Sequence, residues 1–523
     1  MKGDRETMPD PLRSLSLDAL LEEHRRSRPE HIAAVFEDRV LTYPQLADRV
    51  IRLANALADS GVEPGDRVLW AGQNAHVVLE GLVACARIGA IFCPLNWRQS
   101  AEEVAFVIDD LEPRIIIWQE REIGDVVRRG AAQASWQPAH WLAFDATGEG
   151  SYDHFIRSAS PMDALGGAMS DPDRPCLLMY TAAFDGQPNG ALINQTAFLW
   201  QNLSIVDIQA LSSDTVFLNS GPLFHIGTLM VSMAVFHVGG TNVFIRRSDA
   251  RAVAEHIHRH RCTLAFLVGK TQEEMVALNG DGSYDLKCLR SPSFSPEWDA
   301  MVTPTPERSL FGFGQTEVCG PVVWQYYGRG TSISRNGRTG PVAQVRIVDA
   351  EGREVDQGEV GEIVIRGPTV MLGYWRRPEL NAQRQRDGWH HTNDLGRREI
   401  DGSITFVGPK TQMIKSMAEN IYPAEVENCL RLHPAVADCA IIGVPDDQWV
   451  QSVKAIVQLH PEQRVTPDEL ITHCRERLAS YKKPRHVAFI DALPRTAANA
   501  IDYATLDSRF GGGNYPGGLT RGA

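Results

Sequence analysis

The chain has 523 residues, 43% of them hydrophobic and 22% charged, and this length predicts about two to four packed units around a large buried core. A formal charge of −13 disfavours a nucleic-acid partner, because non-specific affinity for nucleic acid comes from Lys and Arg that neutralise phosphates. No apolar run approaches the roughly 18 residues of a membrane span, and the charged N-terminus lacks the apolar region of a secretory signal, so we expect a soluble, cytoplasmic protein without a transmembrane segment.

The first part of the chain has the pattern of an α/β protein. Residues 17–60 show helical spacing on both sides of a short strand-like stretch, which predicts a helix, a hairpin and a second helix. From Asp66 onward, short apolar runs alternate with helical stretches, and the alternation recurs through residues 176–350. This pattern is typical of β-α-β units on a largely parallel sheet.

The remainder of the chain predicts two smaller units and a tail. Around residues 343–410, short strands separated by Gly and Asp turns indicate an antiparallel subdomain. We therefore expect a large N-terminal domain at 1–410, with β-α-β units followed by this antiparallel subdomain. A small hinged α+β domain is predicted at 411–510, and the Gly-rich composition of residues 511–523 predicts a flexible tail.

Metal and disulfide sites are disfavoured by the pattern of cysteine and histidine. The nine cysteines are odd in number and scattered, without a C-x-x-C pair, so we expect buried thiols. The run HIHRHRC at residues 256–262 falls on a predicted helix, where a charged surface is the simpler interpretation than a metal site.

A series of motifs in fixed order carries a family resemblance. RSLFGFGQTEVCG predicts a strand and a Gly turn followed by Gln315, Thr316 and Glu317. After it come RTGPVAQVRIVD, GEIVIRGPTVMLGYWRRPE, DGWHHTNDLG, ENIYPAEVE and YKKPRHVAFIDALPRT. Together they resemble the adenylate-forming (AMP-binding) superfamily, in its acyl-CoA synthetase or fatty-acid–CoA ligase branch. The resemblance implies a large N-terminal portion of two α/β subdomains and an antiparallel β subdomain, with a small C-terminal α+β lid that rotates about a hinge. It also implies a reaction that joins a carboxylate to ATP before transfer to CoA or another acceptor.

The phosphate loop departs from the family pattern Y-T-S-G-T-T-G-x-P-K-G. The chain has YTAAFDGQPNG, which keeps Thr181 and Gly186 as nucleotide-binding candidates but places Asn189 at the lysine position. Asp185 adds a carboxylate where a polyphosphate would lie, and like charges repel. The alternative interpretation is an ordinary surface turn.

Further positions of the ligase chemistry are replaced as well. The catalytic lysine expected in a P-R-T-x-x-G-K context is Ala500, and loss of such a charge contact costs about 10²–10⁵ in rate. The ribose-contacting arginine is Pro409, and two glycines beside the pantetheine path are Met417 and Ala418. The Gly-Glu pair expected in the C-terminal domain is Val450 and Gln451. Substitution for the lysine by Lys482 or Lys483 is the open alternative.

Several site residues of the family are retained. By resemblance, Thr316 and Glu317 belong to the nucleotide site, Glu317 as the Mg²⁺-associated carboxylate, and Asp394 is the ribose-binding aspartate. The alternative is that these carboxylates serve local hydrogen bonding. His225, Phe224 and Gly314 are the candidates for the edge of an acyl pocket, with a buried structural histidine as the alternative for His225.

Three functions remain open from the sequence. The first is a protein that binds a small carboxylic acid or acyl thioester but does not adenylate it. The second is a residual or rewired ligase that forms a CoA thioester, amide or ester, with ATP, Mg²⁺ and CoA as the cofactors implied by resemblance. The third is a non-catalytic partner, either as a homodimer or in association with an active paralogue.

Overall fold

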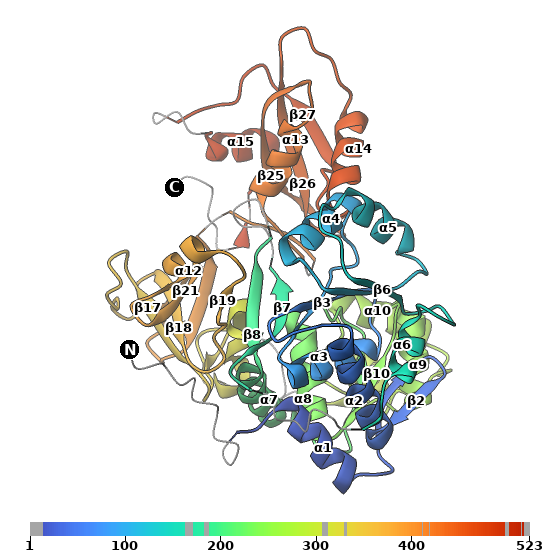
Figure 1. Ribbon diagram of the computed structural model, residues 1–523. Coiled ribbons are helices and arrows are strands. Elements are labelled where there is room, and N and C mark those ends of the chain that lie inside the picture. The colour runs from blue at the N-terminus through green and yellow to red at the C-terminus, as the bar shows by residue number, and fades with distance from the viewer. Residues whose placement is uncertain are drawn as a thin grey trace, which may run out of the picture.

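The structure is a computed structural model of the whole chain. It describes residues 14–162, 171–181, 188–305, 312–328, 332–410, 412–417, 419–496, 501–513 and 515–516. As Figure 1 shows, a large α/β body lies below a smaller unit made from the C-terminal part of the chain, with an antiparallel subdomain to one side. The expected mixed α/β fold with a large N-terminal and a smaller C-terminal domain is confirmed.

The N-terminal segment folds as the hydrophobic pattern predicts. Helix α1 (Leu17–Ser27) starts at Ser16, whose hydroxyl accepts the Ala19 N–H, as an N-cap residue does. The antiparallel hairpin β1 (Ile32–Phe36) and β2 (Arg39–Thr42) follows, and then α2 (Tyr43–Asp59). The apolar side chains of both helices are buried, so this segment covers one side of the α/β body.

A seven-stranded sheet forms the centre of the large domain. Its order is β19-β8-β7-β4-β3-β5-β6, and the four neighbouring pairs from β7 to β6 are parallel. The strands are β3 (Arg67–Ala71), β4 (Ile91–Pro94), β5 (Ile115–Trp118), β6 (His140–Ala143), β7 (Pro175–Tyr180), β8 (Gly190–Asn194) and β19 (Gly373–Tyr374). The helices that connect or flank them are α3 (Val77–Ile88), α4 (Ala101–Leu111), α5 (Gly124–Gln133), α6 (Tyr152–Ser158) and α7 (Gln195–Gln209).

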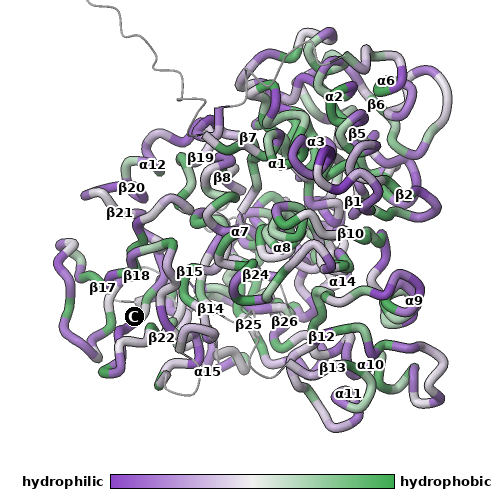
Figure 2. The backbone as a smooth tube through the Cα atoms, turned by 90° about the horizontal axis from the view of Figure 1, so that it is seen from below, coloured by the Kyte–Doolittle hydropathy of each residue, from purple (hydrophilic) through white to green (hydrophobic). Residues whose placement is uncertain are grey.

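A second, five-stranded sheet has the order β11-β9-β10-β1-β2. Its other strands are β9 (Val216–Asn219), β10 (Thr241–Phe244) and β11 (Leu264–Ala265), and its helices are α8 (Ile226–His237), α9 (Ala250–His260), α10 (Gly269–Leu278) and α11 (Pro296–Met301). The short pair β12 (Arg290–Ser291) and β13 (Thr303–Pro304) lies beside α11. Figure 2 shows hydrophobic residues concentrated along α8 and the strands near it, consistent with the complete burial of most of that helix.

The antiparallel part of the large domain consists of two small sheets. One contains β14 (Gly312–Gln315), β15 (Gly320–Trp324) and β16 (Arg338–Thr339), with the short 3-10 helices η1 (Thr316–Val318) and η2 (Gln325–Gly328). The other contains β17 (Gln344–Val348), β18 (Gly361–Arg366), β20 (Gln385–Arg386), β21 (Trp389–Arg398) and β22 (Ile404–Pro409), with α12 (Pro378–Arg384) beside it. The strands of this region therefore match the predicted texture of 343–410.

The C-terminal unit, which we call the lid, is a five-stranded sheet with three helices. Its strands are β23 (Ile414–Ser416), β24 (Glu419–Ile421), β25 (Val436–Asp446), β26 (Val450–Leu459) and β27 (His486–Phe489). Its helices are α13 (Pro423–Arg431), α14 (Pro467–Arg477) and α15 (Tyr503–Phe510). Among the helices in the described part of the chain, none is both long and apolar enough to cross a membrane.

Candidate functional site

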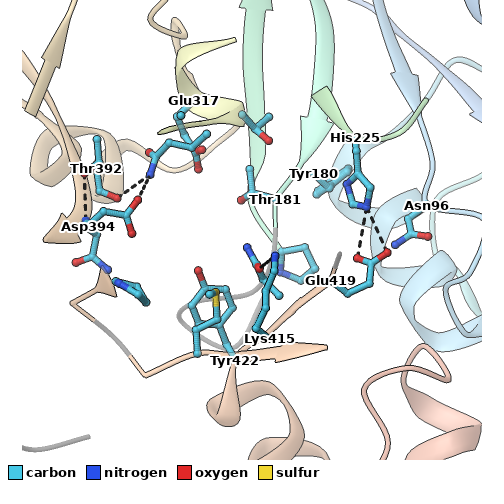
Figure 3. A pocket seen from close by; sticks show the side chains of 18 of the residues that line it. Asn96, Tyr180, Thr181, His225, Glu317, Thr392, Asp394, Lys415, Glu419 and Tyr422 are labelled. Atoms are coloured by element: carbon cyan, nitrogen blue, oxygen red, sulfur yellow. Dashed lines mark hydrogen bonds and ion pairs between the residues drawn. The ribbon is translucent and has the colours of Figure 1, made fainter. Parts of the chain in front are cut away.

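A cavity of about 550 Å³ lies between the large domain and the lid (Figure 3). Most of the site residues that the sequence predicted line this cavity, namely Thr181, Phe224, His225, Gly314, Thr316, Glu317 and Asp394. Two more, Gly186 and Ala500, lie outside the described residues. From the lid, the cavity is lined by Met413, Lys415, Glu419, Asn420, Tyr422, Tyr481, Lys482 and Pro516.

Glu317 lies in η1, which directly follows strand β14. Its side chain is buried, and Tyr374 donates its hydroxyl to Oε1 at 2.7 Å. Burial raises the pKa of Glu317, because a carboxylate loses its hydration there, although the Tyr374 bond opposes the shift. The carboxyl is therefore held in one orientation facing the cavity.

Asp394 lies on β21 and accepts a hydrogen bond from Gln315, the residue before Thr316. Gln315 donates Nε2 to Asp394 Oδ2 at 2.8 Å, and its Oε1 lies 3.2 Å from His390 Nε2. Burial raises the pKa of Asp394 to about 7 and lowers that of His390 to about 3. His390 is thus neutral near pH 7 and donates to Gln315, so a neutral histidine and one amide orient a carboxyl that gains its charge near neutrality.

The Mg²⁺ implied by the resemblance would depend on Glu317. Mg²⁺ is commonly bound by one or two carboxylates, with substrate phosphates and waters completing its octahedron. Tyr374 already occupies Oε1, which leaves Oε2 as the oxygen that Glu317 could offer. The side chain therefore fits a phosphate-borne Mg²⁺, for which it would supply one ligand. Within the described residues, no group of three or more His, Cys, Asp or Glu side chains could hold a metal ion alone, the α9 histidines included.

All three predicted acyl-pocket residues line the cavity, and His225 lies across it from Glu317 and Asp394 in Figure 3. Phe224 is buried, and its ring lies 4.6 Å from that of His225, measured between centroids. The His225 side chain is 42% exposed, so the alternative of a buried structural histidine is wrong. Gly314 is needed for packing as well, because a Cβ there would lie 2.2 Å from the Gly320 carbonyl oxygen. These three residues give the cavity one aromatic wall and one imidazole.

The described ends of the phosphate loop show how its lysine position is used. Thr181 donates both its N–H and its hydroxyl to the Asn189 carbonyl, at 2.9 and 3.2 Å. Asn189, at the position where the family has lysine, is only 1% exposed. Residues 182–187 lie outside the described part of the chain. The side chain at position 189 therefore lies within the fold, whereas Tyr180, Thr181 and Pro188 of the same stretch line the cavity.

A hairpin of the lid enters the cavity from below in Figure 3, and sequence reasoning missed it. It consists of β23 and β24, which carry Lys415 and Glu419. Glu419 accepts a bond from Arg98 Nη1 at 2.6 Å and lies 3.4 Å from His225 Nε2. Burial alone would raise the pKa of Glu419, but His225 and Arg98 lower it overall. The ENIYPAEVE motif was visible in the sequence, yet nothing local indicated that Arg98 would be its partner.

Lys415 is the lysine of this hairpin that faces the cavity centre in Figure 3. Its ammonium donates to Asn420 Oδ1 at 2.7 Å, and burial lowers its pKa. Lys482, the sequence candidate for a replacement lysine, also lines the cavity but is held elsewhere. It bonds Glu103 of α4 and Glu425 of α13, each at 2.6 Å. Those two carboxylates hold the Lys482 pKa above its ordinary value despite burial, so its charge is committed to joining the two domains.

At two positions where the family pattern has glycine, this chain has another residue, and its backbone φ is positive as glycine favours. Met417 has a φ of 52° and Val450 a φ of 70°, both in the left-handed region. A β-branched residue such as valine is rarely found there. Both lie at one end of the lid sheet, where Ser416 pairs with Val450 and the Met417 N–H donates to the Trp449 carbonyl. The turn geometry is retained although the residues that normally allow it have changed.

Comparisons with known proteins agree on the family. The family model for an AMP-binding enzyme matches residues 21–375, and that for an AMP-binding enzyme C-terminal domain matches residues 425–499. An indoleacetate–CoA ligase from Aromatoleum aromaticum is 34% identical over 93% of this chain and 96% of its own. A feruloyl-CoA synthase from an Amycolatopsis species is 36% identical over 93% of this chain and 98% of its own.

Two solved structures of one related enzyme differ in how well they superpose on this chain. The o-succinylbenzoate CoA synthetase from Bacillus subtilis, as a double mutant bound to a CoA product analogue, gives a TM-score of 0.76 at 25% identity. That match covers 93% of this chain and 97% of the other. In complex with AMP, the same synthetase gives 0.62 at 25% identity, covering 92% and 96%. The chain therefore resembles the form with the product analogue more closely.

Proposed function

Because the chain belongs to the family of AMP-binding enzymes, we propose that its interdomain cavity binds a carboxylic acid or an acyl thioester, and that the protein no longer forms an acyl-adenylate from ATP. The observation that carries the proposal is the cavity between the large domain and the lid. The lid hairpin reaches the large domain through Glu419, and Phe224 and His225 form the facing wall. A concave space with an aromatic wall and several polar groups suits an organic acid.

The relatives support an acid as the ligand. The two relatives described above are named as a ligase of indoleacetate and a synthase of feruloyl-CoA. Each of them therefore handles an aromatic carboxylic acid and CoA. The buried Phe224 ring offers an apolar surface to such an acid. Lys415, whose ammonium faces the same space, offers a positive charge to a carboxylate or a thioester carbonyl.

The proposal that adenylation is lost rests on the residues that would handle ATP. The phosphate-loop lysine is replaced by Asn189, which is buried, and the catalytic lysine is replaced by Ala500. Asp394, the ribose-binding candidate, has a pKa near 7 and is already bonded to Gln315. Losing the two lysines removes positive charge that would offset a triphosphate, while Asp185 adds negative charge.

The overall superposition on solved structures supports a thioester over an adenylate. The related synthetase superposes better in its form with a CoA product analogue than in its form with AMP. In this chain, the lid contacts the large domain through Glu419 with Arg98 and through Lys482 with Glu103. We infer that the cavity between large domain and lid is organised for an acyl group carried on a thiol.

Calorimetric titration with ferulic acid, feruloyl-CoA and Mg·ATP separately tests the proposal. We expect binding of the acid or the thioester without ATP, at least tenfold weakening in His225→Ala, and no pyrophosphate release when acid and Mg·ATP are combined. His154→Ala, at the surface of α6, is the matched control. Tight binding of Mg·ATP that disappears in Asp394→Asn would contradict the loss of adenylation, and the absence of binding by a panel of aryl and aliphatic acids and their thioesters would contradict the ligand class.

A rewired ligase is the second candidate, because Lys415 lies in the cavity. Lys482 is committed to two carboxylates, so Lys415 is the lysine better placed to take over a charge-stabilising role. In that case, pyrophosphate release with an aryl acid should occur and fall by about 10²-fold or more in Lys415→Ala. Lys483→Ala is the control, since the Lys483 ammonium donates to the Ser480 carbonyl at the surface. Release that is equal in the two variants would exclude this role for Lys415.

A further inference from the structure

The Gly-rich segment after α15 has a defined path in its described part. Gly511 ends the helix with a φ of 77°, and Gly513 has a φ of 113°, which both favour glycine. Between them, a Cβ at Gly512 would lie 2.1 Å from Asp507 Oδ1. Each of the three glycines therefore has a separate geometric reason in a tight turn. The described residues 511–513 and 515–516 of the Gly-rich segment therefore follow a specific turn.

Tyr515 anchors the chain after this turn. Its side chain is 5% exposed, and its hydroxyl donates to Asp507 Oδ1 at 2.6 Å while accepting the Gly443 N–H at 3.0 Å. Gly443 lies within β25, and a Cβ there would come 3.0 Å from the Tyr515 ring. The sheet thus has a glycine at the position where the tyrosine ring packs against it. The next residue, Pro516, lines the cavity.

One amide connects this segment to the hairpin that enters the cavity. Gln451 on β26 is buried, and its Nε2 donates to the Gly513 carbonyl at 3.1 Å. The Oε1 of the same side chain accepts the Lys415 N–H at 2.9 Å. The family pattern has glutamate at this position, and a carboxylate could accept from Lys415 but could not donate to Gly513. Glutamine is therefore the residue that can hold both chains at once.

We propose that Tyr515 and Gln451 are positioning residues for the cavity: they fix the C-terminal segment behind the β23–β24 hairpin and thereby hold Lys415 and Glu419 in place. The connection runs from the Tyr515 hydroxyl to Asp507 and Gly443, along the chain to Gly513, and through Gln451 to Lys415. The final residue of the described segment, Pro516, adds to the wall of the cavity directly. The proposal concerns the free protein and does not depend on which ligand the cavity takes.

Amide hydrogen exchange on the full-length chain, measured by mass spectrometry, tests this connection. In Tyr515→Phe, we expect exchange in the peptide covering residues 412–422 to rise about tenfold, because the segment that orients Gln451 loses its anchor. Exchange in the core of β25 and in α13 should stay within about twofold of the natural chain. Tyr327→Phe is the matched control, since the Tyr327 hydroxyl donates to Asp207 at 3.1 Å at an exposed site remote from the lid.

A second variant separates the two bonds of the amide. In Gln451→Glu, the acceptor for the Lys415 N–H remains while the donor to Gly513 is lost, so we expect faster exchange at residues 511–516 and retained protection at Lys415. Unchanged exchange at 412–422 in Tyr515→Phe would overturn the proposal. An equal rise throughout the lid would overturn it as well, because the tyrosine would then contribute to general stability and not to the position of the hairpin.

Discussion

The Lys482 ammonium lies 2.6 Å from Glu103 Oε1, so a lysine of the lid is buried against a carboxylate of the large domain. Glu425 contacts the same ammonium from within the lid, also at 2.6 Å. Both carboxylates are at least nine-tenths buried, and burial raises the pKa of Glu425. The contact between the two domains therefore includes one buried ammonium that is shared by two buried carboxylates.

Replacing Lys482 should lower the free energy of unfolding, because Glu103 and Glu425 would stay buried. Lys482→Met leaves two buried carboxylates without their counter-ion, and we expect a loss of about 3–5 kcal/mol in the free energy of unfolding, measured in urea at pH 7. Lys483→Met should stay within about 0.5 kcal/mol, because its ammonium bonds a carbonyl at the surface. Equal losses in the two variants would show that the ion cluster contributes nothing specific.

Asp394 should make stability fall as the pH rises toward neutrality. Its pKa is raised from 3.8 to about 7 in the folded chain, so the unfolded chain releases this proton first, and folding is penalised progressively between about pH 4 and pH 7. Asp394→Asn removes that penalty. Relative to the natural chain, the variant should gain about 2–3 kcal/mol between pH 5 and pH 8 in urea unfolding. Asp447→Asn, in an exposed turn, is the matched control.

Restoring glycine at position 450 should stabilise the lid. Val450 is 63% exposed and has a φ of 70°, so its side chain contributes little packing while its backbone is strained. We expect Val450→Gly to raise the free energy of unfolding by about 1 kcal/mol. Val360, also exposed but without a positive φ, is the control, and Val360→Gly should be neutral or destabilising. Loss of stability in Val450→Gly would mean that Val450 packs in a way that offsets its strain.

We expect the hydrogen bond between Tyr374 and Glu317 to stabilise the fold more than a surface hydrogen bond of the same kind. Tyr374→Phe leaves the buried Glu317 without its hydroxyl donor, and we expect a cost of about 1–3 kcal/mol together with a further rise in the Glu317 pKa. Carbonyl-region infrared titration would follow that carboxyl directly. Tyr327→Phe, which breaks an exposed tyrosine–aspartate bond, should change stability by less than about 0.5 kcal/mol.

Local pattern was sufficient for much of the fold. The helix, hairpin and helix at the N-terminus and the helices and strands of the lid follow from apolar spacing, which depends only on neighbours in the sequence. Motif resemblance placed Thr181, Glu317 and Asp394 in one cavity because the whole scaffold is shared. The pairing of Arg98 with Glu419 had no comparable signal, since 321 positions separate the two residues.

In the Gly-rich segment, composition gave no sign of the turn that the described glycines form. Three successive glycines are typical of a mobile linker, but here each satisfies a separate requirement of one turn, and Tyr515 is the residue that fixes the result. The informative feature was the buried tyrosine beside the glycines, because an aromatic ring needs an apolar site and a partner for its hydroxyl. Gln451 was noticed in the sequence as a departure from glutamate, and its second bond became apparent only with the tail in place.

The start of α4 has a consequence for how the chain is made. Ser100 caps this helix and donates its hydroxyl to the Arg477 carbonyl at 2.6 Å, while Glu103 of the same capping box holds Lys482. Glu103 and Lys482 are 379 positions apart, and synthesis at about 5–20 residues per second would separate their emergence from the ribosome by roughly 20–75 s. During that interval, Glu103 lies at the surface of the large domain in contact with water, because Lys482, which will bury it, has not yet been synthesised.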